Sequence, residues 1–153
     1  MKIDIRHAVM GDVYEIKNLI NKQAQKGKML PVSLNQVFEN LRNFWVICDN
    51  RGKIIGCGAL KIVWKNLGEI RSVVIRNTKQ RKGYGTKLIE KLIQEAKELG
   101  IKKIFVLTYV PDFFERFGFV RTEKTKLPHK IWIDCINCPK FPRCDEIPMI
   151  KEL

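Results

Sequence analysis

The sequence lacks several features, and each absence narrows the class of protein that it can encode. Its 153 residues contain no apolar run long enough to span a membrane, and the N-terminus has no signal-peptide pattern. We see no internal repeat and no low-complexity linker. We therefore expect a soluble, cytoplasmic protein with a single domain over residues 1–153 and no membrane among its partners.

Cysteine is scarce and odd in number, with five residues in a chain of ordinary size. This number argues against a disulfide framework and favours reduced thiols or a metal site. Three of the five form the pattern Cys135-x-x-Cys138-x-x-x-x-x-Cys144. Because a structural zinc site needs a fourth ligand, we expect no metal here and plain reduced thiols. The alternatives are a zinc or iron–sulfur site completed by another residue, and a redox pair of Cys135 with Cys138.

Acidic residues are the other scarce class. The sequence has 29 lysines and arginines but only 16 aspartates and glutamates, which gives a net charge of +13. Residues 51–100 hold 12 of these basic residues against four acidic ones. Such a concentration favours an anionic partner near this stretch. Nucleic acid is a competing partner, but the stretch lacks interleaved exposed aromatics and any nucleic-acid motif, so we expect none. A lysine-rich solvated surface explains part of the charge in either case.

The most informative stretch runs from Glu69 to Gly100. β-Branched residues over 70–75 predict a buried strand. An apolar stripe at helical spacing then predicts an amphipathic helix, formed by Leu88, Ile89, Leu92, Ile93, Ala96 and Leu99. Gly100 stands where a left-handed residue would end that helix.

The loop between this strand and this helix contains two glycines that suit anion binding. Gly83 and Gly85 have no Cβ, so a phosphate can approach the backbone N–H groups and the positive end of the helix. Arg81 and Lys82 add positive charge. The alternative is an ordinary strand–helix turn with glycines for tightness, and spacing alone does not choose between the two.

The remaining chain predicts a mixture of strands and helices. Alternating or continuous apolar runs indicate strands at 2–6, 44–48, 53–63, 103–108, 119–122 and 147–153. Helical spacing, Ser33 as a cap and prolines as first residues indicate helices at 12–27, 34–41, 111–117 and 127–136. This content is that of an α/β protein in which helices flank a central sheet.

The loop pattern Gln80-x-x-Gly83-x-Gly85 resembles the acetyl-CoA signature of the GNAT superfamily of N-acetyltransferases. Residues 113–119, Phe-Phe-Glu-Arg-Phe-Gly-Phe, resemble the closing helix-to-strand segment of that family. The resemblance implies one α/β domain with a central mixed β-sheet and acetyl-CoA as co-substrate. It implies that the loop binds the CoA pyrophosphate, through Gln80, Arg81, Lys82, Gly83, Tyr84, Gly85 and Thr86. It also implies that the strand before the loop pairs through its backbone with the pantetheine arm, at Val73, Val74 and Ile75.

Acetyl transfer to an amine needs a base for the amine proton, a donor for the oxyanion and an acid for the thiolate. The resemblance implies Glu69 as the base, with a surface carboxylate as the alternative. It implies a backbone N–H around Val74 as the oxyanion donor. The family's usual acid is a tyrosine, and Phe114 takes that place beside the cofactor in this chain. Tyr109, at the end of the 103–108 strand, is the remaining candidate acid, with a core or rim aromatic as the alternative.

Residues 105–108 and 113–119, followed by Leu127-Pro128, resemble the acetyltransferase domain of N-acetylglutamate synthases, in a short stand-alone form. The likeness covers about residues 69–130. It implies a small-molecule amine as substrate, glutamate above all, which attacks acetyl-CoA directly in a ternary complex. Arg71 is the candidate ligand for the glutamate carboxylates, because strand alternation gives it the direction of Glu69. Lys130 and Arg143 are weaker candidates, and a solvated arginine is the alternative.

Two other functions stay open at this point. Acetylation of protein lysines or N-termini would need an open groove for a peptide. A module that binds acetyl-CoA without turnover would be consistent with Phe114 in place of the tyrosine. The sequence does not choose the acceptor amine, and it does not choose between a monomer and a homodimer.

Overall fold

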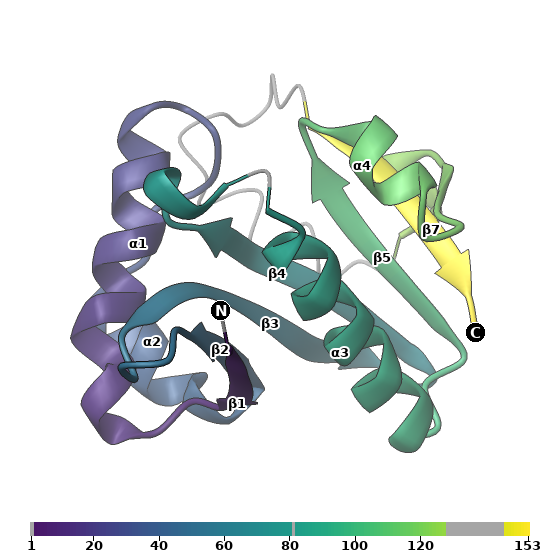
Figure 1. Cartoon of the computed structure of the whole chain (residues 1–153). Helices are drawn as coiled ribbons and strands as arrows, with labels where there is room; N and C mark the ends of the chain where they lie inside the picture. Colours follow the sequence, from purple (N-terminus) through teal and green to yellow (C-terminus); the bar gives the residue numbers. More distant parts are fainter. Residues whose placement is uncertain (1, 81, 128–145) are drawn as a thin grey trace. The chain divides into compact units, whose positions relative to one another are not determined.

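The computed structural model describes residues 2–80, 82–127 and 146–153 (Figure 1). Its strands are β1 (Asp4–His7), β2 (Phe44–Cys48), β3 (Ile54–Trp64), β4 (Leu67–Ile75), β5 (Lys103–Thr108), β6 (Val120–Arg121) and β7 (Ile147–Glu152). Its helices are α1 (Val13–Gln25), α2 (Leu34–Glu39), α3 (Tyr84–Glu98) and α4 (Pro111–Glu115). Within the described ranges the strands form a 7-stranded sheet in the order β1-β2-β3-β4-β5-β7-β6.

The sheet is mixed, as an α/β protein of the predicted kind requires. β4 pairs in parallel with β5, and the pairs β1–β2, β2–β3, β5–β7 and β6–β7 are antiparallel. The predicted fold class is therefore confirmed. By its contacts the chain divides into two compact units, one of Met1–Leu60 with Arg71–Glu95 and one of Lys61–Ile70 with Ala96–Leu153. The expectation of a single domain stays a prediction.

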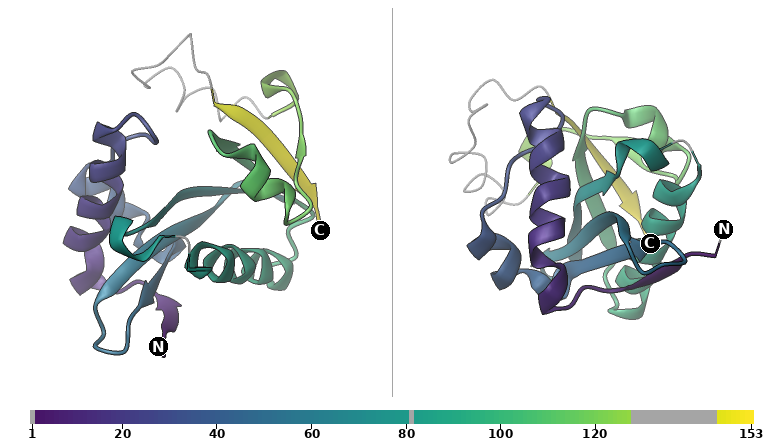
Figure 2. Two further views of the ribbon diagram at one scale, coloured as in Figure 1. Left: turned by 45° about the horizontal axis from the view of Figure 1, so that its top comes forward. Right: turned by 60° about the vertical axis from the view of Figure 1, so that its left-hand side comes forward.

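The first unit has its core between α1 and the inner strands. α1 buries an apolar stripe against alternate residues of β2, and this cluster contains Val13, Ile16, Leu19, Ile20, Val37, Leu41, Phe44, Val46, Cys48, Ile54, Cys57, Ala59 and Val74. Trp45 and Ile47 lie between these β2 residues and so face the other side of the sheet. α3 covers that side (Figure 2).

Gly58 of β3 allows the close approach of α3 to the sheet. A Cβ at this position would lie 3.3 Å from the side chains of both Leu88 and Leu92. Those two leucines are fully buried, as the helical stripe predicts. Lys91, on the same helix, holds its ammonium 5.1 Å from the centre of the Trp45 ring.

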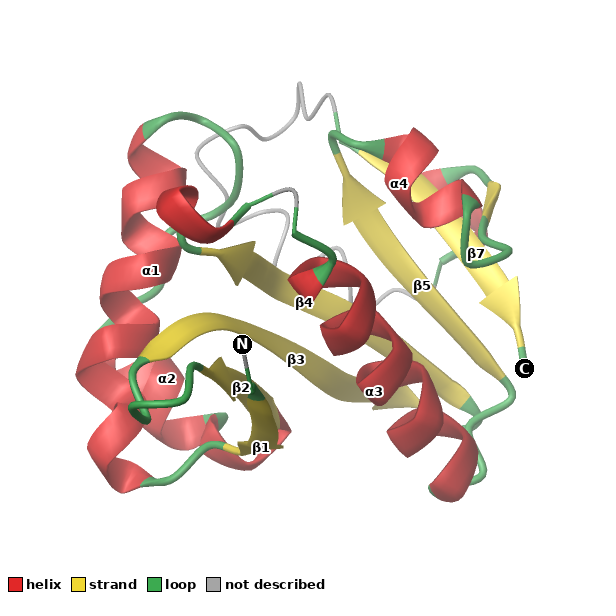
Figure 3. Ribbon diagram, viewed as in Figure 1, coloured by secondary structure: helices red, strands yellow, loops and turns green. Residues whose placement is uncertain are grey.

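The second unit is built around β5, which lies between β4 and β7 (Figure 3). Residues 103–108 form this strand with the bounds that the sequence predicts. Phe105 is fully buried with Leu127, and the partly buried residues Val63, Leu67, Leu107 and Ile150 pack against them. α4 begins at Pro111, as expected from the fixed φ of proline at a first helical position.

One residue of the predicted helical stripe is placed wrongly. α3 ends at Glu98, and Leu99 is 57% exposed. Gly100 has a φ of +78°, so the chain leaves the helix there, and Ile101 takes up the buried position with 6% exposure. The predicted helix at 127–136 lies almost wholly outside the described residues.

Asp12 fixes the start of α1 through three hydrogen bonds. Its carboxylate accepts from the Arg6 guanidinium at 2.8 and 3.1 Å and from the Val9 backbone N–H at 2.8 Å. Burial would raise the pKa of Asp12, but the hydrogen bonds from Arg6 and Val9 outweigh it and hold the pKa below its ordinary value.

Replacing Asp12 with asparagine is therefore expected to cost about 2 kcal/mol of unfolding free energy at pH 7, because a charge-assisted pair is lost. A carboxyl with a lowered folded pKa contributes stability that is present above its unfolded pKa, about 4, and is lost as the pH falls through the folded value. The gap between wild type and Asp12→Asn should thus close between pH 5 and pH 2, as measured by urea unfolding. A gap that is constant with pH would contradict this account.

Within the described ranges, no helix has the length and apolar character needed to cross a membrane.

Candidate functional site

The strand–loop–helix segment presents the first backbone N–H groups of α3 beside an open position at Gly83. Gly83 has a φ of +81°, and no residue that the structure describes lies within 4 Å of the position that its Cβ would take. The Lys87 N–H donates to the Gly83 carbonyl at 3.2 Å, which starts the ladder of α3. The N–H groups of the first residues of a helix have no carbonyl partner inside it. Because Gly83 has no side chain, an anion can therefore approach this helix end closely.

The charge around this helix end is positive, and it comes from fewer residues than the sequence suggests. Lys82 and Lys87 are exposed, and Lys79 is half-buried. Arg76 is engaged elsewhere: its guanidinium pairs with Glu15 and donates to the Ile54 carbonyl at 3.0 Å. Arg81 lies outside the described residues. This donor set of helix N–H groups and lysines suits the phosphates of CoA.

Gln80, the first residue of the loop pattern, is exposed, and its amide bonds to the residues just before it. Its Nε2 donates to the Ile75 carbonyl at 3.0 Å and to Asn77 Oδ1 at 3.1 Å. The Gln80 side chain therefore connects the start of the loop to the end of β4, and its place among the cofactor-binding residues stays a prediction. Tyr84, Gly85 and Thr86 form the first turn of α3 and are half-buried.

The strand before the loop contains an irregularity that the sequence does not reveal. Ser72 has a φ of +57°, a left-handed conformation that a residue with a side chain seldom adopts. Cys57 donates its thiol to the Ser72 carbonyl at 3.7 Å from the first unit's core. Burial raises the pKa of the Cys57 thiol far above its ordinary value, so this group stays protonated and able to donate.

The left-handed residue interrupts the strand between Arg71 and Val73. Regular alternation of side chains therefore does not continue from Arg71 to Val73. Ser72 follows both Glu69 and Arg71, so the shared direction of those two residues and the role of Arg71 as a substrate ligand stay predictions. Val74 is 5% exposed in the first unit's core, whereas Val73 and Ile75 are half-buried.

The second unit holds the candidate catalytic residues. Glu69 is 8% exposed, and its register partner across the parallel pair is Phe105 of β5. A carboxylate this deeply buried does not fit the alternative of a surface residue, because acidic side chains are seldom buried unless they have a partner or a role. Tyr109 is half-buried just after β5, where the Val110 N–H donates to Thr108 Oγ1 at 2.9 Å and shapes the turn into α4.

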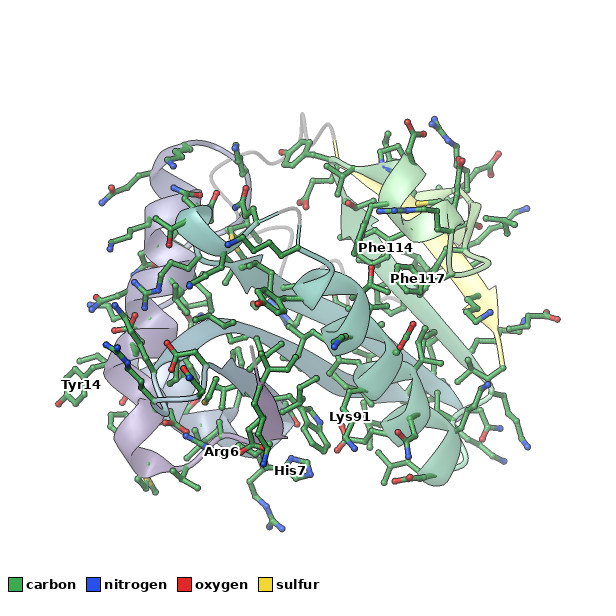
Figure 4. The ribbon with its side chains drawn as sticks, viewed as in Figure 1. Arg6, His7, Tyr14, Lys91, Phe114 and Phe117 are labelled. Carbon is green, nitrogen blue, oxygen red and sulfur yellow. The ribbon has the colours of Figure 1, made fainter. Side chains whose placement is uncertain are left out.

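Phe114 lies in an aromatic cluster within the second unit (Figure 4). Its ring meets those of Phe113 and Phe119 edge-on, with centroids 5.2 and 5.4 Å apart, and it is 4% exposed. Packing in this cluster is a sufficient reason for a phenylalanine here. Its predicted contact with the cofactor stays a prediction.

The cysteine pattern of Cys135, Cys138 and Cys144 lies outside the described residues. Across 2–80, 82–127 and 146–153, no group of three or more histidine, cysteine, aspartate or glutamate residues is arranged to hold a metal ion. Cys48 and Cys57 are buried free thiols.

Two residues near the loop were missed by sequence reasoning. Gln23 of α1 is 7% exposed and donates from Nε2 to Asn77 Oδ1 at 3.0 Å. The two are 54 positions apart. A polar residue on the apolar side of an amphipathic helix is the signal that would have pointed to Gln23.

Comparison with known proteins agrees with this geometry. A model of the acetyltransferase (GNAT) family matches residues 11–119. An uncharacterized N-acetyltransferase of Chlorobaculum tepidum is 40% identical over 149 residues, which cover 97% of this chain and 96% of that protein. An amino-acid acetyltransferase of Mycobacterium tuberculosis is 36% identical over 130 residues, which cover 84% of this chain and 74% of that protein.

A solved structure of N-acetylglutamate synthase from Neisseria gonorrhoeae, complexed with coenzyme A and N-acetyl-glutamate, is similar to the whole chain. The match has a TM-score of 0.90 at 25% sequence identity, and it covers 100% of this chain and 35% of the synthase chain.

Proposed function

The chain belongs to the acetyltransferase (GNAT) family, and we propose that it transfers the acetyl group of acetyl-CoA to the α-amine of an amino acid, with glutamate as the acceptor. The observation that carries the proposal is the open, positively charged helix end at Gly83, which suits the CoA pyrophosphate. The amino-acid acceptor is supported by the amino-acid acetyltransferase of M. tuberculosis, and glutamate by the synthase of N. gonorrhoeae.

The proposed reaction is direct transfer in a ternary complex. The neutral amine nitrogen forms a bond to the thioester carbonyl carbon, and the bond from that carbon to sulfur breaks. Glu69 produces this neutral amine by taking a proton from its ammonium form, and the nitrogen loses a second proton to water as the amide forms. A backbone N–H near Val74 donates to the oxyanion, and the thiolate takes a proton from Tyr109 or from water.

The test is the release of CoA thiol from acetyl-CoA with glutamate, the other amino acids and a lysine peptide as separate acceptors. Release with glutamate, or with glutamate far above the other amino acids, is expected. Release with the peptide alone would move the function to protein acetylation. Tight binding of CoA without release for any acceptor would favour a binding module.

Replacing Arg71 with glutamine is expected to raise the KM for glutamate about thirtyfold, because one charge-assisted bond to a carboxylate is lost, and to leave the KM for acetyl-CoA unchanged. Steady-state kinetics with each substrate varied in turn measure both values. Arg51→Gln, in the exposed turn between β2 and β3, is the matched control for the loss of one positive charge. An unchanged KM for glutamate in Arg71→Gln would remove Arg71 from the acceptor pocket.

A further inference from the structure

Gln23 has a buried polar side chain, and it has no role in the proposed reaction. It lies near the C-terminal end of α1, is 7% exposed, and donates from Nε2 to Asn77 Oδ1 at 3.0 Å. A buried amide is retained where it has a defined hydrogen-bond partner, because an unpartnered one is costly. Its partner belongs to the short 3-10 turn Asn77–Lys79, which separates β4 from the Gln80–Gly85 loop, the phosphate loop of the proposed site.

Asn77 Oδ1 is the point at which three parts of the first unit meet. It accepts from Gln23 of α1 and, at 3.1 Å, from Nε2 of Gln80. The same Gln80 amide also donates to the carbonyl of Ile75, the last residue of β4, at 3.0 Å. Asn77 Oδ1 thus links the helix to Gln80, the first residue of the Gln80–Gly85 loop, and the Gln80 amide links both to the strand end.

The neighbouring residue is tied to the same helix at a second point. Arg76 donates its backbone N–H to the Ile55 carbonyl at 2.7 Å, and its guanidinium pairs with Glu15 of α1. Glu15 and Gln23 are eight residues apart, which is about 12 Å along a helix axis. α1 is itself held in the core by its buried apolar stripe. Two consecutive residues before the loop are therefore held to a rigid element at separate points.

We propose that Gln23 is a positioning residue for the phosphate loop. Through Asn77 and Gln80 it fixes the start of the loop relative to α1, so that the N–H groups after Gly83 are already in place when the CoA pyrophosphate arrives. A loop that is ordered beforehand loses less conformational freedom on binding, and this difference appears as affinity for the pyrophosphate. The inference rests on the proposed function, since it concerns the same site.

The test compares Gln23→Met, which keeps the side-chain length and removes the amide, with Gln25→Met on the exposed end of the same helix. Two thioesters are used: acetyl-CoA, and acetyl-pantetheine, which has the same reacting group without the pyrophosphate. Gln23→Met is expected to raise the KM for acetyl-CoA about fivefold, the effect of one hydrogen bond, and to leave kcat unchanged. Its kcat/KM for acetyl-pantetheine should equal that of wild type and of Gln25→Met.

A second variant tests the route through Asn77 and does not depend on a core substitution. Asn77 is exposed, so Asn77→Ala removes the acceptor without opening the core. The double variant Gln23→Met with Asn77→Ala should bind CoA no more weakly than Asn77→Ala alone, because both changes remove the same hydrogen bond. Isothermal titration calorimetry measures the dissociation constant of CoA for the single and the double variant.

The outcomes separate the inference from the function on which it rests. Wild type that binds no CoA would overturn the proposed function and the inference together. Normal CoA binding by wild type and equal binding by Gln23→Met would overturn the inference alone. A parallel loss with acetyl-CoA and acetyl-pantetheine, or additive losses in the double variant, would also overturn it, because a general loss of packing gives that pattern.

Discussion

Replacing Glu69 with glutamine is expected to lower kcat about a hundredfold at pH 7 and to leave the affinity for CoA unchanged. Glutamine keeps the shape and the hydrogen-bonding oxygen of glutamate, but its amide does not accept a proton from the attacking amine. Glu69 is 8% exposed, so bulk water has little access to take over the proton transfer at this position. The substitution is therefore expected to slow the chemical step, which lowers kcat, without weakening the binding of CoA.

The pH dependence of this variant provides a stricter test than its activity at one pH. An amino-acid amine is mostly protonated at pH 7, and its neutral fraction rises as the pH is raised. If Glu69 removes the proton, the deficit of Glu69→Gln should shrink between pH 7 and pH 9.5 in CoA-release assays. Glu152→Gln, at the end of β7 with a side chain 80% exposed, is the control and should match wild type. Wild-type kcat in Glu69→Gln would exclude Glu69 as the base.

The sequence predicts the elements well where local periodicity decides them. The strand at 103–108 has the predicted bounds, and α1, β2 and β3 lie within two residues of theirs. The acetyltransferase (GNAT) family was also predicted from the Gln80–Gly85 loop, and the family match over residues 11–119 confirms it. These predictions depend on residues close together in the chain, where apolar spacing and glycine placement carry the information.

The sequence does not predict features that depend on contacts between distant residues. The position of β7 between β5 and β6 depends on pairing over more than forty residues, as in Phe105 with Ile150. The left-handed φ of Ser72 has no sign in the sequence, because serine is not a residue that marks this conformation. The hydrogen bonds from the exposed Gln80 amide to Asn77 and Ile75 are likewise not encoded in the motif spacing.

Gly83→Val is expected to raise the KM for acetyl-CoA at least tenfold and to lower the melting temperature by a few degrees. The strain has a local cause: a β-branched residue at a φ of +81° costs about 1–3 kcal/mol relative to glycine. The loss of binding has a different cause. Among residues 2–80, 82–127 and 146–153, nothing lies within 4 Å of the new Cβ, so the valine occupies the space through which a phosphate reaches the helix N–H groups.

Gly100 allows these two causes to be separated. It has a φ of +78°, no described residue lies within 4 Å of its Cβ position, and it follows the opposite end of α3 from Gly83. Gly100→Val should therefore lose a similar amount of stability in thermal unfolding and keep the wild-type KM for acetyl-CoA. Equal KM values in the two variants would mean that backbone strain alone explains the effect at Gly83. A large KM increase at Gly83 only, with matched melting temperatures, assigns the loss to the space that a CoA phosphate needs.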